Sequence, residues 1–305
     1  MLRFRKFTVF IFLYLFLFFS FFLPVIQPAA SRAETRIIES ATGDVFELRY
    51  RRLQPGEPLA VVWKKAVSDF AGVYFGESSF WLKRDGRPGQ FLLLGLDVMS
   101  EPGRRVVEID LWSGGKIKEK LNIELEIAMR DFPKKKLTVA QKYVTPPREV
   151  LDRIKREAEL LSLVYSSSSS EWLAEGSFIL PCEGKLFPNF GQQRIYNNVP
   201  RSVHTGIDIA VPLGHPIKAT NSGRVVLASD LYYSGKTVIV DHGLGLFSSY
   251  AHLSKLLVKR GQMVKKGEPV GLAGSTGLST GPHLHWAVKI YEARVDPLAL
   301  LELEF

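Results

Sequence analysis

The chain has 305 residues, of which 46% are hydrophobic and 23% are charged. This composition supplies enough apolar side chains for sizeable cores and excludes a mostly disordered protein, while the length accommodates about two domains. Lys and Arg number 40 against 31 Asp and Glu. The basic excess suits an anionic partner such as cell wall, membrane surface or nucleic acid, but it also describes an ordinary basic soluble protein.

Residues 1–33 are typical of an export signal. Arg3, Arg5 and Lys6 are followed by an almost wholly apolar run over residues 7–23, and Ser31 and Ala33 stand at the −3 and −1 positions of a cleavage site. The run of about 17 residues is long for a signal peptide and near the minimum for a membrane-spanning helix, so a cleaved signal and a retained membrane anchor both stay open. Either outcome predicts that the remaining chain lies in the periplasm or cell envelope.

Residues 34–145 are predicted to form an all-β accessory domain. Residues 121–128 alternate between apolar and mostly polar side chains, which is the pattern of a half-buried strand. Further strands are predicted over residues 45–50, 59–63, 91–98 and 106–112, and several short strands at such spacing indicate a β-sandwich. The role of this domain is open among binding, spacing and inhibition.

Residues 146–170 are predicted to be a linking helix and a flexible linker. Thr145 is a candidate helix cap, and Leu151, Ile154, Ala158 and Leu161 recur at helical spacing as one buried stripe. Ser166 to Ser170 is a run of five serines, a composition typical of flexible linkers. The boundary to a second domain, residues 171–305, is therefore expected here.

Residues 171–305 are again predicted to be β, with short apolar runs over residues 224–228, 237–240 and 285–290. All six histidines of the chain lie between positions 204 and 285. The single cysteine, Cys182, excludes an internal disulfide, and we interpret it as a small buried hydrophobic residue in preference to a zinc ligand.

Two spacings among the histidines indicate a metal site. His283 and His285 are two residues apart, so on a strand they point to one face, and His204 and Asp208 share a face of an extended segment. Two imidazoles and a carboxylate are ligands that Zn²⁺ favours, and three protein ligands leave a fourth position for water, as in catalytic zinc sites. His204, Asp208 and one histidine of the His283–His285 pair are therefore candidate ligands.

Residues 178–297 resemble the lysostaphin-type, or LytM-type, zinc endopeptidases. The matching stretches follow the family's order and comprise Phe190-Gly191 with Arg194, His204 to Asp208, Gly223 to Val226, Val240 to Gly243, Tyr250 to Leu253, Gly274 to Gly277 and Ser279 to His285. The upstream β region and helix look like those of envelope members of this family from Gram-negative bacteria. The resemblance implies a mainly β fold: a β-sandwich-like domain, a linking helix and an antiparallel β peptidase domain.

The resemblance also implies residue roles. His204, Asp208 and His285 would bind Zn²⁺, while His252 and His283 would be the catalytic histidines. One would accept a proton from the attacking water and the other would stabilise the oxyanion, in an order that the spacing does not assign. His215 and His242 match no functional position.

The expected function is hydrolysis of peptide cross-links in peptidoglycan. Bonds between D-alanine and diaminopimelate are favoured over glycine bridges, and peptidoglycan, not nucleic acid, is the expected partner. The alternative is a catalytically silent wall-binding protein that activates another peptidoglycan hydrolase.

Overall fold

The computed structural model describes residues 33–84 and 90–303. The predicted signal peptide or membrane anchor, residues 1–33, lies outside this part of the chain except for Ala33. Among the described residues, no helix has the length and hydropathy needed to cross a membrane. The fold is mainly β with antiparallel sheets, as the sequence predicts.

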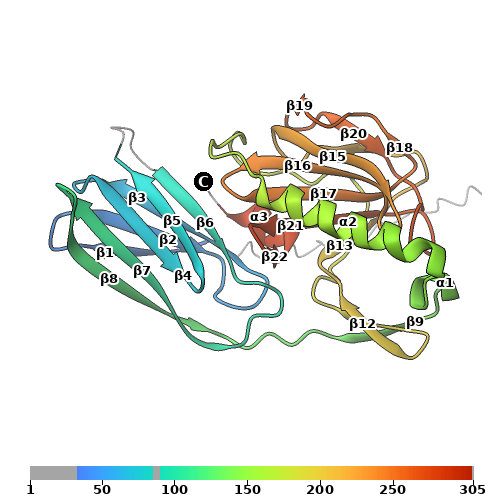
Figure 1. Cartoon of the computed structure of the whole chain (residues 1–305), viewed down its shortest axis with the longest axis horizontal. Helices are drawn as coiled ribbons and strands as arrows, with labels where there is room; N and C mark the ends of the chain where they lie inside the picture. Colours follow the sequence, from blue (N-terminus) through green and yellow to red (C-terminus); the bar gives the residue numbers. More distant parts are fainter. Residues whose placement is uncertain (1–32, 85–89, 304–305) are drawn as a thin grey trace, which may run out of the picture. The chain divides into compact units, whose positions relative to one another are not determined.

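Two four-stranded antiparallel sheets form the N-terminal sandwich (Figure 1). One has the order β1-β2-β3-β6 and comprises Glu34–Glu39, Val45–Tyr50, Pro58–Lys65 and Gln90–Gly95. The other has the order β5-β4-β7-β8 and comprises Ser78–Lys83, Phe70–Phe75, Gly103–Ser113 and Lys116–Ile127. Ile123, Leu125 and Ile127 are buried while their neighbours in sequence are exposed, which confirms the predicted period of two.

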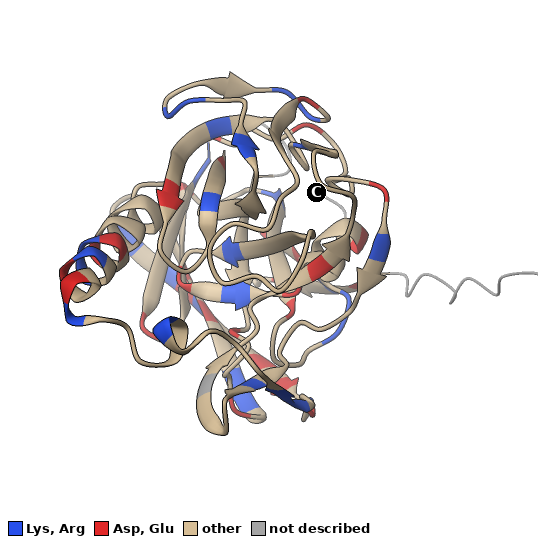
Figure 2. Cartoon of the chain, turned by 90° about the vertical axis from the view of Figure 1, so that its right-hand side faces the viewer, with Lys and Arg blue, Asp and Glu red and all other residues tan. Residues whose placement is uncertain are grey.

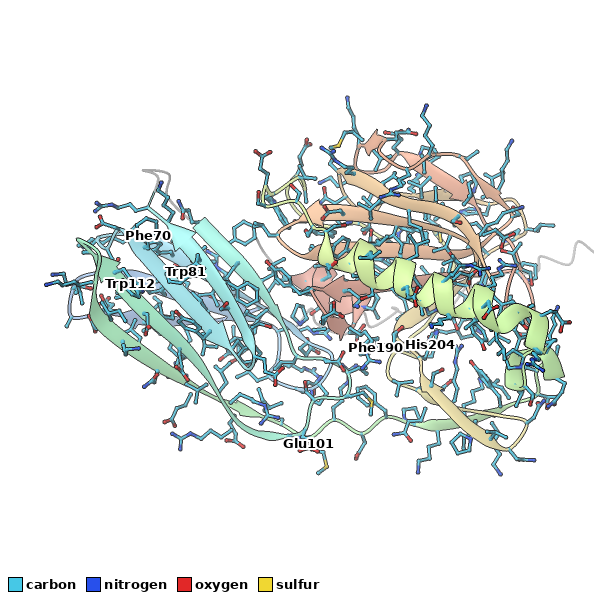
Figure 3. The ribbon with its side chains drawn as sticks, viewed as in Figure 1. Phe70, Trp81, Glu101, Trp112, Phe190 and His204 are labelled. Carbon is cyan, nitrogen blue, oxygen red and sulfur yellow. The ribbon has the colours of Figure 1, made fainter. Side chains whose placement is uncertain are left out.

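Three aromatic side chains gather on the outer face of the second sheet (Figure 3). Phe70 and Trp81 are 40% and 57% exposed, and the rings of Trp81 and Trp112 lie 6.1 Å apart. Gly72 lies beneath them, where an added Cβ would come within 3.2 Å of the Trp81 ring. These rings therefore pack on one another and on backbone, not in the core between the two sheets.

The C-terminal half is built on an eight-stranded antiparallel sheet. Its strands pair in the order β10-β13-β21-β17-β16-β15-β19, with β22 also paired to β21, and comprise Lys185–Phe187, Gly206–Ala210, Leu284–Ile290, Leu246–Leu253, Gly235–Gly243, Gly223–Leu231, Met263–Val264 and Ala293–Val295. A small sheet of order β14-β20-β18 comprises Pro216–Lys218, Pro269–Leu272 and Lys255–Leu256. Helix α3, Pro297–Glu302, follows β22.

The segment between the two halves differs from the prediction. Strand β9, Lys134–Leu137, pairs in parallel with β11, Gln193–Tyr196, which in turn pairs with β12, Val199–Val203. Residues 128–145 therefore do not belong to the sandwich sheets, and they include a helical turn, α1, Gln141–Val144. The predicted all-β domain ending at residue 145 is wrong at this boundary, because β9 joins strands of the C-terminal half.

Helix α2, Arg148–Ser166, begins three residues after the predicted cap Thr145. Its N-terminal boundary residue is Pro147, and no side chain caps it. Helical geometry is disfavoured for a residue that directly precedes a proline. Thr145 precedes Pro146 and Pro146 precedes Pro147, so the helix does not begin at either residue. The predicted Thr145 cap is therefore wrong.

The buried face of α2 also differs from the predicted stripe. Leu160, Leu161, Val164 and Tyr165 pack on β15, β16 and β17, whereas Leu151 is 48% exposed and Ala158 is exposed as well. Polar contacts help to set this face, since the backbone N–H of Tyr232 donates to the Glu157 carboxylate at 2.8 Å. A stripe traced through apolar residues alone misses such contacts. Figure 2 shows both charge signs along the outer face of the helix.

The serine run is bound to the C-terminal half instead of forming a flexible linker. The Ser168 hydroxyl and the backbone N–H of Ser169 donate to the two carboxylate oxygens of Asp241, at 2.9 and 2.7 Å. Asp241 is only 2% exposed, and a buried carboxylate needs such donors. The prediction of a flexible linker is wrong because the small serines satisfy this buried charge.

Candidate metal centre

Asp208 and His285 are brought together by strand pairing. Strand β13 lies antiparallel to β21, and the register places Asp208 directly opposite His285. Directly opposite residues have Cβ atoms about 4.5–5.5 Å apart, so their side chains meet on one face of the sheet. The His285 Nδ1 atom lies 3.0 Å from the Asp208 Oδ1 atom.

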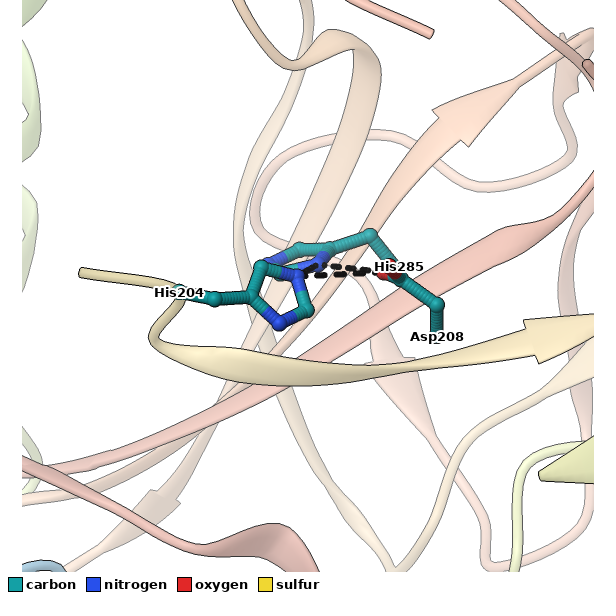
Figure 4. A group of neighbouring side chains, drawn as sticks. All are labelled: His204, Asp208 and His285. Atoms are coloured by element: carbon teal, nitrogen blue, oxygen red, sulfur yellow. Dashed lines mark hydrogen bonds and ion pairs between the residues drawn. The ribbon is translucent and has the colours of Figure 1, made fainter. Parts of the chain in front are cut away.

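His204 completes a triangle of ligating atoms (Figure 4). It lies in the two-residue connection between β12 and β13, four residues before Asp208. Its Nε2 atom lies 2.8 Å from His285 Nδ1 and 3.2 Å from Asp208 Oδ1. The predicted sharing of one face by His204 and Asp208 is therefore matched by the geometry.

The triangle is close to, and slightly tighter than, a tetrahedral metal site. Zinc bonds of about 2.0–2.2 Å place neighbouring ligand atoms about 3.3–3.6 Å apart, and the three separations here run from 2.8 to 3.2 Å. Two imidazole nitrogens and one carboxylate oxygen are also a donor set that suits a borderline cation such as zinc. These residues therefore fit a divalent metal with a fourth position left for a non-protein ligand.

Neighbouring groups fix the triangle in its ligating form. Asn189 accepts a hydrogen bond from His204 Nδ1 through its backbone carbonyl, at 3.0 Å, so the Nε2 lone pair points into the centre. The Asn189 side-chain amide and Arg194 donate to Asp208 Oδ2, at 2.8 and 3.1 Å, which leaves Oδ1 for a metal. Asn189 is not among the residues predicted from the sequence, although it directly precedes the Phe190-Gly191 stretch of the family resemblance.

The pKa values favour the same protonation states. Burial lowers the pKa of His204 to about 4 and outweighs the neighbouring Asp208 carboxylate, which raises it. Burial alone would raise the pKa of Asp208, but its contacts with His204 and His285 outweigh burial and hold that pKa well below the usual range. A neutral imidazole and an ionised carboxylate are the forms that bind metal.

His252 and His283 flank the triangle. Their ring centroids are 4.9 Å apart, and the His252 ring lies 5.9 Å from that of His285. His252 Nδ1 is 2.8 Å from the Thr276 carbonyl and His283 Nδ1 is 2.8 Å from the Gly281 carbonyl. A carbonyl accepts only from a protonated nitrogen, so in both rings Nδ1 carries hydrogen and Nε2 has a lone pair available. His252 has a positive φ of 61°, an uncommon backbone conformation that is often found at functional sites.

The glycine-rich stretch of residues 271–281 serves mainly to pack backbone on backbone. A Cβ at Gly274 would overlap the backbone of residues 252–254, and a Cβ at Gly277 would overlap that of residues 233–235. Gly274 and Gly277 therefore admit neighbouring backbone of this chain. Gly281 has nothing within 4 Å of its Cβ position and lines an open groove.

This groove has a volume of about 490 Å³ and runs past the metal centre. Asp208 and His283 are part of its lining. One wall consists of residues 278–283, and the facing residues come from β9 and its extension and from residues 187–196. The candidate metal centre is therefore reached from solvent through this groove.

The remaining candidates lie away from this centre. His215 is half-buried in a turn, and its backbone carbonyl accepts from Ala273. Cys182 is 6% exposed and belongs to the apolar core, as expected. His242 is fully buried on β16, where its ring contacts the Ser222 carbonyl at 2.8 Å and the Ser248 hydroxyl at 2.7 Å.

We expect His242 to make folding stability depend on pH. Burial lowers the pKa of His242 from 6.5 to about 4, and this effect outweighs the hydrogen bond with the Ser222 carbonyl, which raises the pKa. Between these values the unfolded chain binds a proton that the folded chain does not, so stability is complete above pH 6.5 and falls as the pH drops towards 4, by about 3 kcal/mol. Urea unfolding in EDTA from pH 7 to 4 should show a shallower decline for His242→Gln. Equal slopes for both proteins would contradict the assignment.

Asp208 and His285 on paired strands meet His204 from the preceding connection at one point, beside two further histidines, which is an arrangement that suits a metallopeptidase centre. Residues 202–297 match Peptidase family M23. The chain therefore contains a peptidase domain of the M23, LytM-type, family. The resemblance seen in the sequence is confirmed.

Relatives in both sequence and structure carry the same domain. The chain is 41% identical over 103 residues to peptidoglycan DD-endopeptidase ShyA of Vibrio cholerae serotype O1, covering 33% of this chain and 24% of the relative. It is 40% identical over 98 residues to DD-carboxypeptidase/endopeptidase Mpg of Neisseria meningitidis serogroup B, covering 32% and 23%. The chain thus spans about a quarter of the length of these relatives. A crystal structure of a putative M23 peptidase from Pseudomonas aeruginosa matches 82% of this chain and 96% of its own, with 29% identity and a TM-score of 0.64.

Proposed function

We propose that this protein is a zinc-dependent endopeptidase that hydrolyses peptide cross-links of peptidoglycan in the cell envelope. The convergence of three ligating atoms with two Nδ1-anchored histidines beside an open groove carries the proposal. Two relatives of the same domain are named peptidoglycan DD-endopeptidases, which supports this substrate. Peptidoglycan lies outside the cytoplasm, so the activity requires export, in agreement with the signal or anchor expected in residues 1–33.

The proposed roles follow from the geometry. His204, Asp208 and His285 hold Zn²⁺, which when bound supplies Lewis acidity to the attacking water and the scissile carbonyl. The Nε2 lone pair of His252 or His283 accepts the proton of the attacking water, and the other ring stabilises the oxyanion as a hydrogen-bond donor in the form in which its Nε2 also carries hydrogen. The backbone carbonyls of Thr276 and Gly281 hold the two rings in position through Nδ1.

Digestion of purified peptidoglycan tests the proposal. We expect the zinc-loaded chain to release products of cleavage between D-alanine and diaminopimelate, identified by mass spectrometry. EDTA should abolish release, and one equivalent of zinc should restore it. His215→Ala, which removes a histidine outside the centre, should behave as the parent chain. Binding to peptidoglycan without release would instead identify a silent wall-binding protein.

A further inference from the structure

Residues 130–144, here called the strap, run from the sandwich along the peptidase half. At one end the Phe132 ring packs on Phe190, with ring centroids 6.1 Å apart, and covers Gly191 so closely that no Cβ fits there. Figure 3 labels Phe190 and His204, which belong to adjoining segments because the Gly191 N–H donates to the His204 carbonyl at 2.8 Å. The strap is therefore anchored beside the metal centre.

Two further contacts fix the rest of the strap. The backbone of Val139 exchanges two hydrogen bonds with the Asn197 side chain, each 3.0 Å long. The Tyr143 hydroxyl donates to the Gly277 carbonyl at 2.6 Å, next to Thr276, whose own carbonyl accepts from His252. The strap is thus held at Asn197 and at Gly277, which are next in sequence to the groove-lining residues Tyr196 and Leu278.

Strand β9 within the strap turns one of three consecutive lysines into the groove. Side chains alternate along a strand, and Lys135, Leu137 and Val139 line the groove. Lys134 and Lys136 are exposed but are not part of that lining. The chain therefore contains its own matched controls, with the same charge and strand but the opposite face.

The strand pairing places Lys135 one residue away from the candidate metal centre, through Arg194. Parallel pairing places Lys135 beside Arg194, and Arg194 donates to Asp208 at 3.1 Å. Arg194 is thus neutralised by a metal ligand, whereas Lys135 has no carboxylate within 4.0 Å among the residues that the structure describes. The groove wall therefore offers an unmatched positive charge close to the reacting centre.

We propose that Lys135 is a specificity-determining residue that binds a free carboxylate adjoining the scissile bond of the cross-link. The inference rests on the proposed function and deepens it. When D-alanine acylates the side-chain amine of diaminopimelate, the carbon that bears this amine also bears a free carboxylate. A glycine bridge has no charged group at that position. The charge on the strap therefore favours cross-links of the diaminopimelate type.

The test uses two synthetic cross-linked peptides, one with this carboxylate free and one with it converted to a carboxamide. For the full chain we expect the KM of the free-carboxylate peptide to be about five- to tenfold lower than that of the carboxamide peptide. A partly exposed ion pair contributes little more than this to binding. Lys135→Ala should remove this preference with kcat retained, Lys135→Arg should restore most of it, and Lys136→Ala should leave it unchanged. The preference should weaken as salt rises.

The outcomes separate this inference from the proposed function, because binding of both peptides is measured alongside cleavage. Equal KM values for the two peptides, or a preference retained in Lys135→Ala, would overturn the inference while leaving peptidase activity intact. Carboxylate-dependent binding that needs Lys135 but leads to no cleavage would support the inference and overturn the proposed function. If the full chain binds neither peptide, both fail.

Discussion

Replacing any one of His204, Asp208 and His285 by alanine is expected to remove bound metal and peptidase activity together. Each substitution leaves two protein ligands, too few for a well-held zinc site. We expect substoichiometric zinc after dialysis and turnover lower by ~10³-fold or more, because the reaction loses its Lewis acid. Metal analysis of the purified variants beside cross-link cleavage rates measures both effects.

The matched control for these three variants is His215→Ala, which should retain one zinc per chain and full turnover. Circular dichroism of all four proteins checks that the β fold persists, since Asp208 also accepts hydrogen bonds from Asn189 and Arg194. If all three variants keep zinc and activity, the metal centre lies elsewhere.

Replacing His252 or His283 by alanine is expected to separate metal binding from catalysis. Both rings commit Nδ1 to a backbone carbonyl, and the His283 Nε2 atom is 3.8 Å from Asp208 Oδ1, farther than either ligand histidine. Each variant should therefore keep near-stoichiometric zinc while losing ~10²-fold or more in kcat, the scale of lost acid–base or oxyanion assistance.

The His283–His285 pair provides the sharpest comparison. Zinc lost from His283→Ala but kept in His285→Ala would show that the two roles are reversed. The pH dependence of kcat in the two catalytic variants identifies the general base, because the limb that reports its ionisation disappears with it.

The sequence predicted the clustering of His204, Asp208 and His285 better than the surroundings of this cluster. The spacing along the chain places His204 near Asp208 and His283 near His285. The pairing of β13 with β21, which brings these two segments together, is visible only in the structure. Asn189 was missed because it acts partly through its backbone carbonyl, which no residue type encodes. Such a contact can be found only once the chain path is known.

The strap was missed for a different reason. Its strand reads Lys-Lys-Lys-Leu, which has no alternation of apolar and polar residues. It becomes a strand because Gln193–Tyr196, about 60 positions away, supplies a parallel partner. Strand formation of this kind depends on a long-range partner, whereas residues 121–128 reveal their strand locally through their own period of two.

The proposed selectivity of the strap and the proposed catalysis are encoded in different parts of the gene. The residues that would perform the chemistry lie within the family-matching stretch 202–297, whereas Lys135 is encoded well upstream of it. If Lys135 sets the proposed preference, recombination that exchanges upstream segments between relatives would change which cross-link is accepted without altering the residues proposed to perform the chemistry. For the same reason, an isolated catalytic fragment trimmed to the family boundaries would lose one wall of its groove, and its selectivity would not represent that of the whole chain.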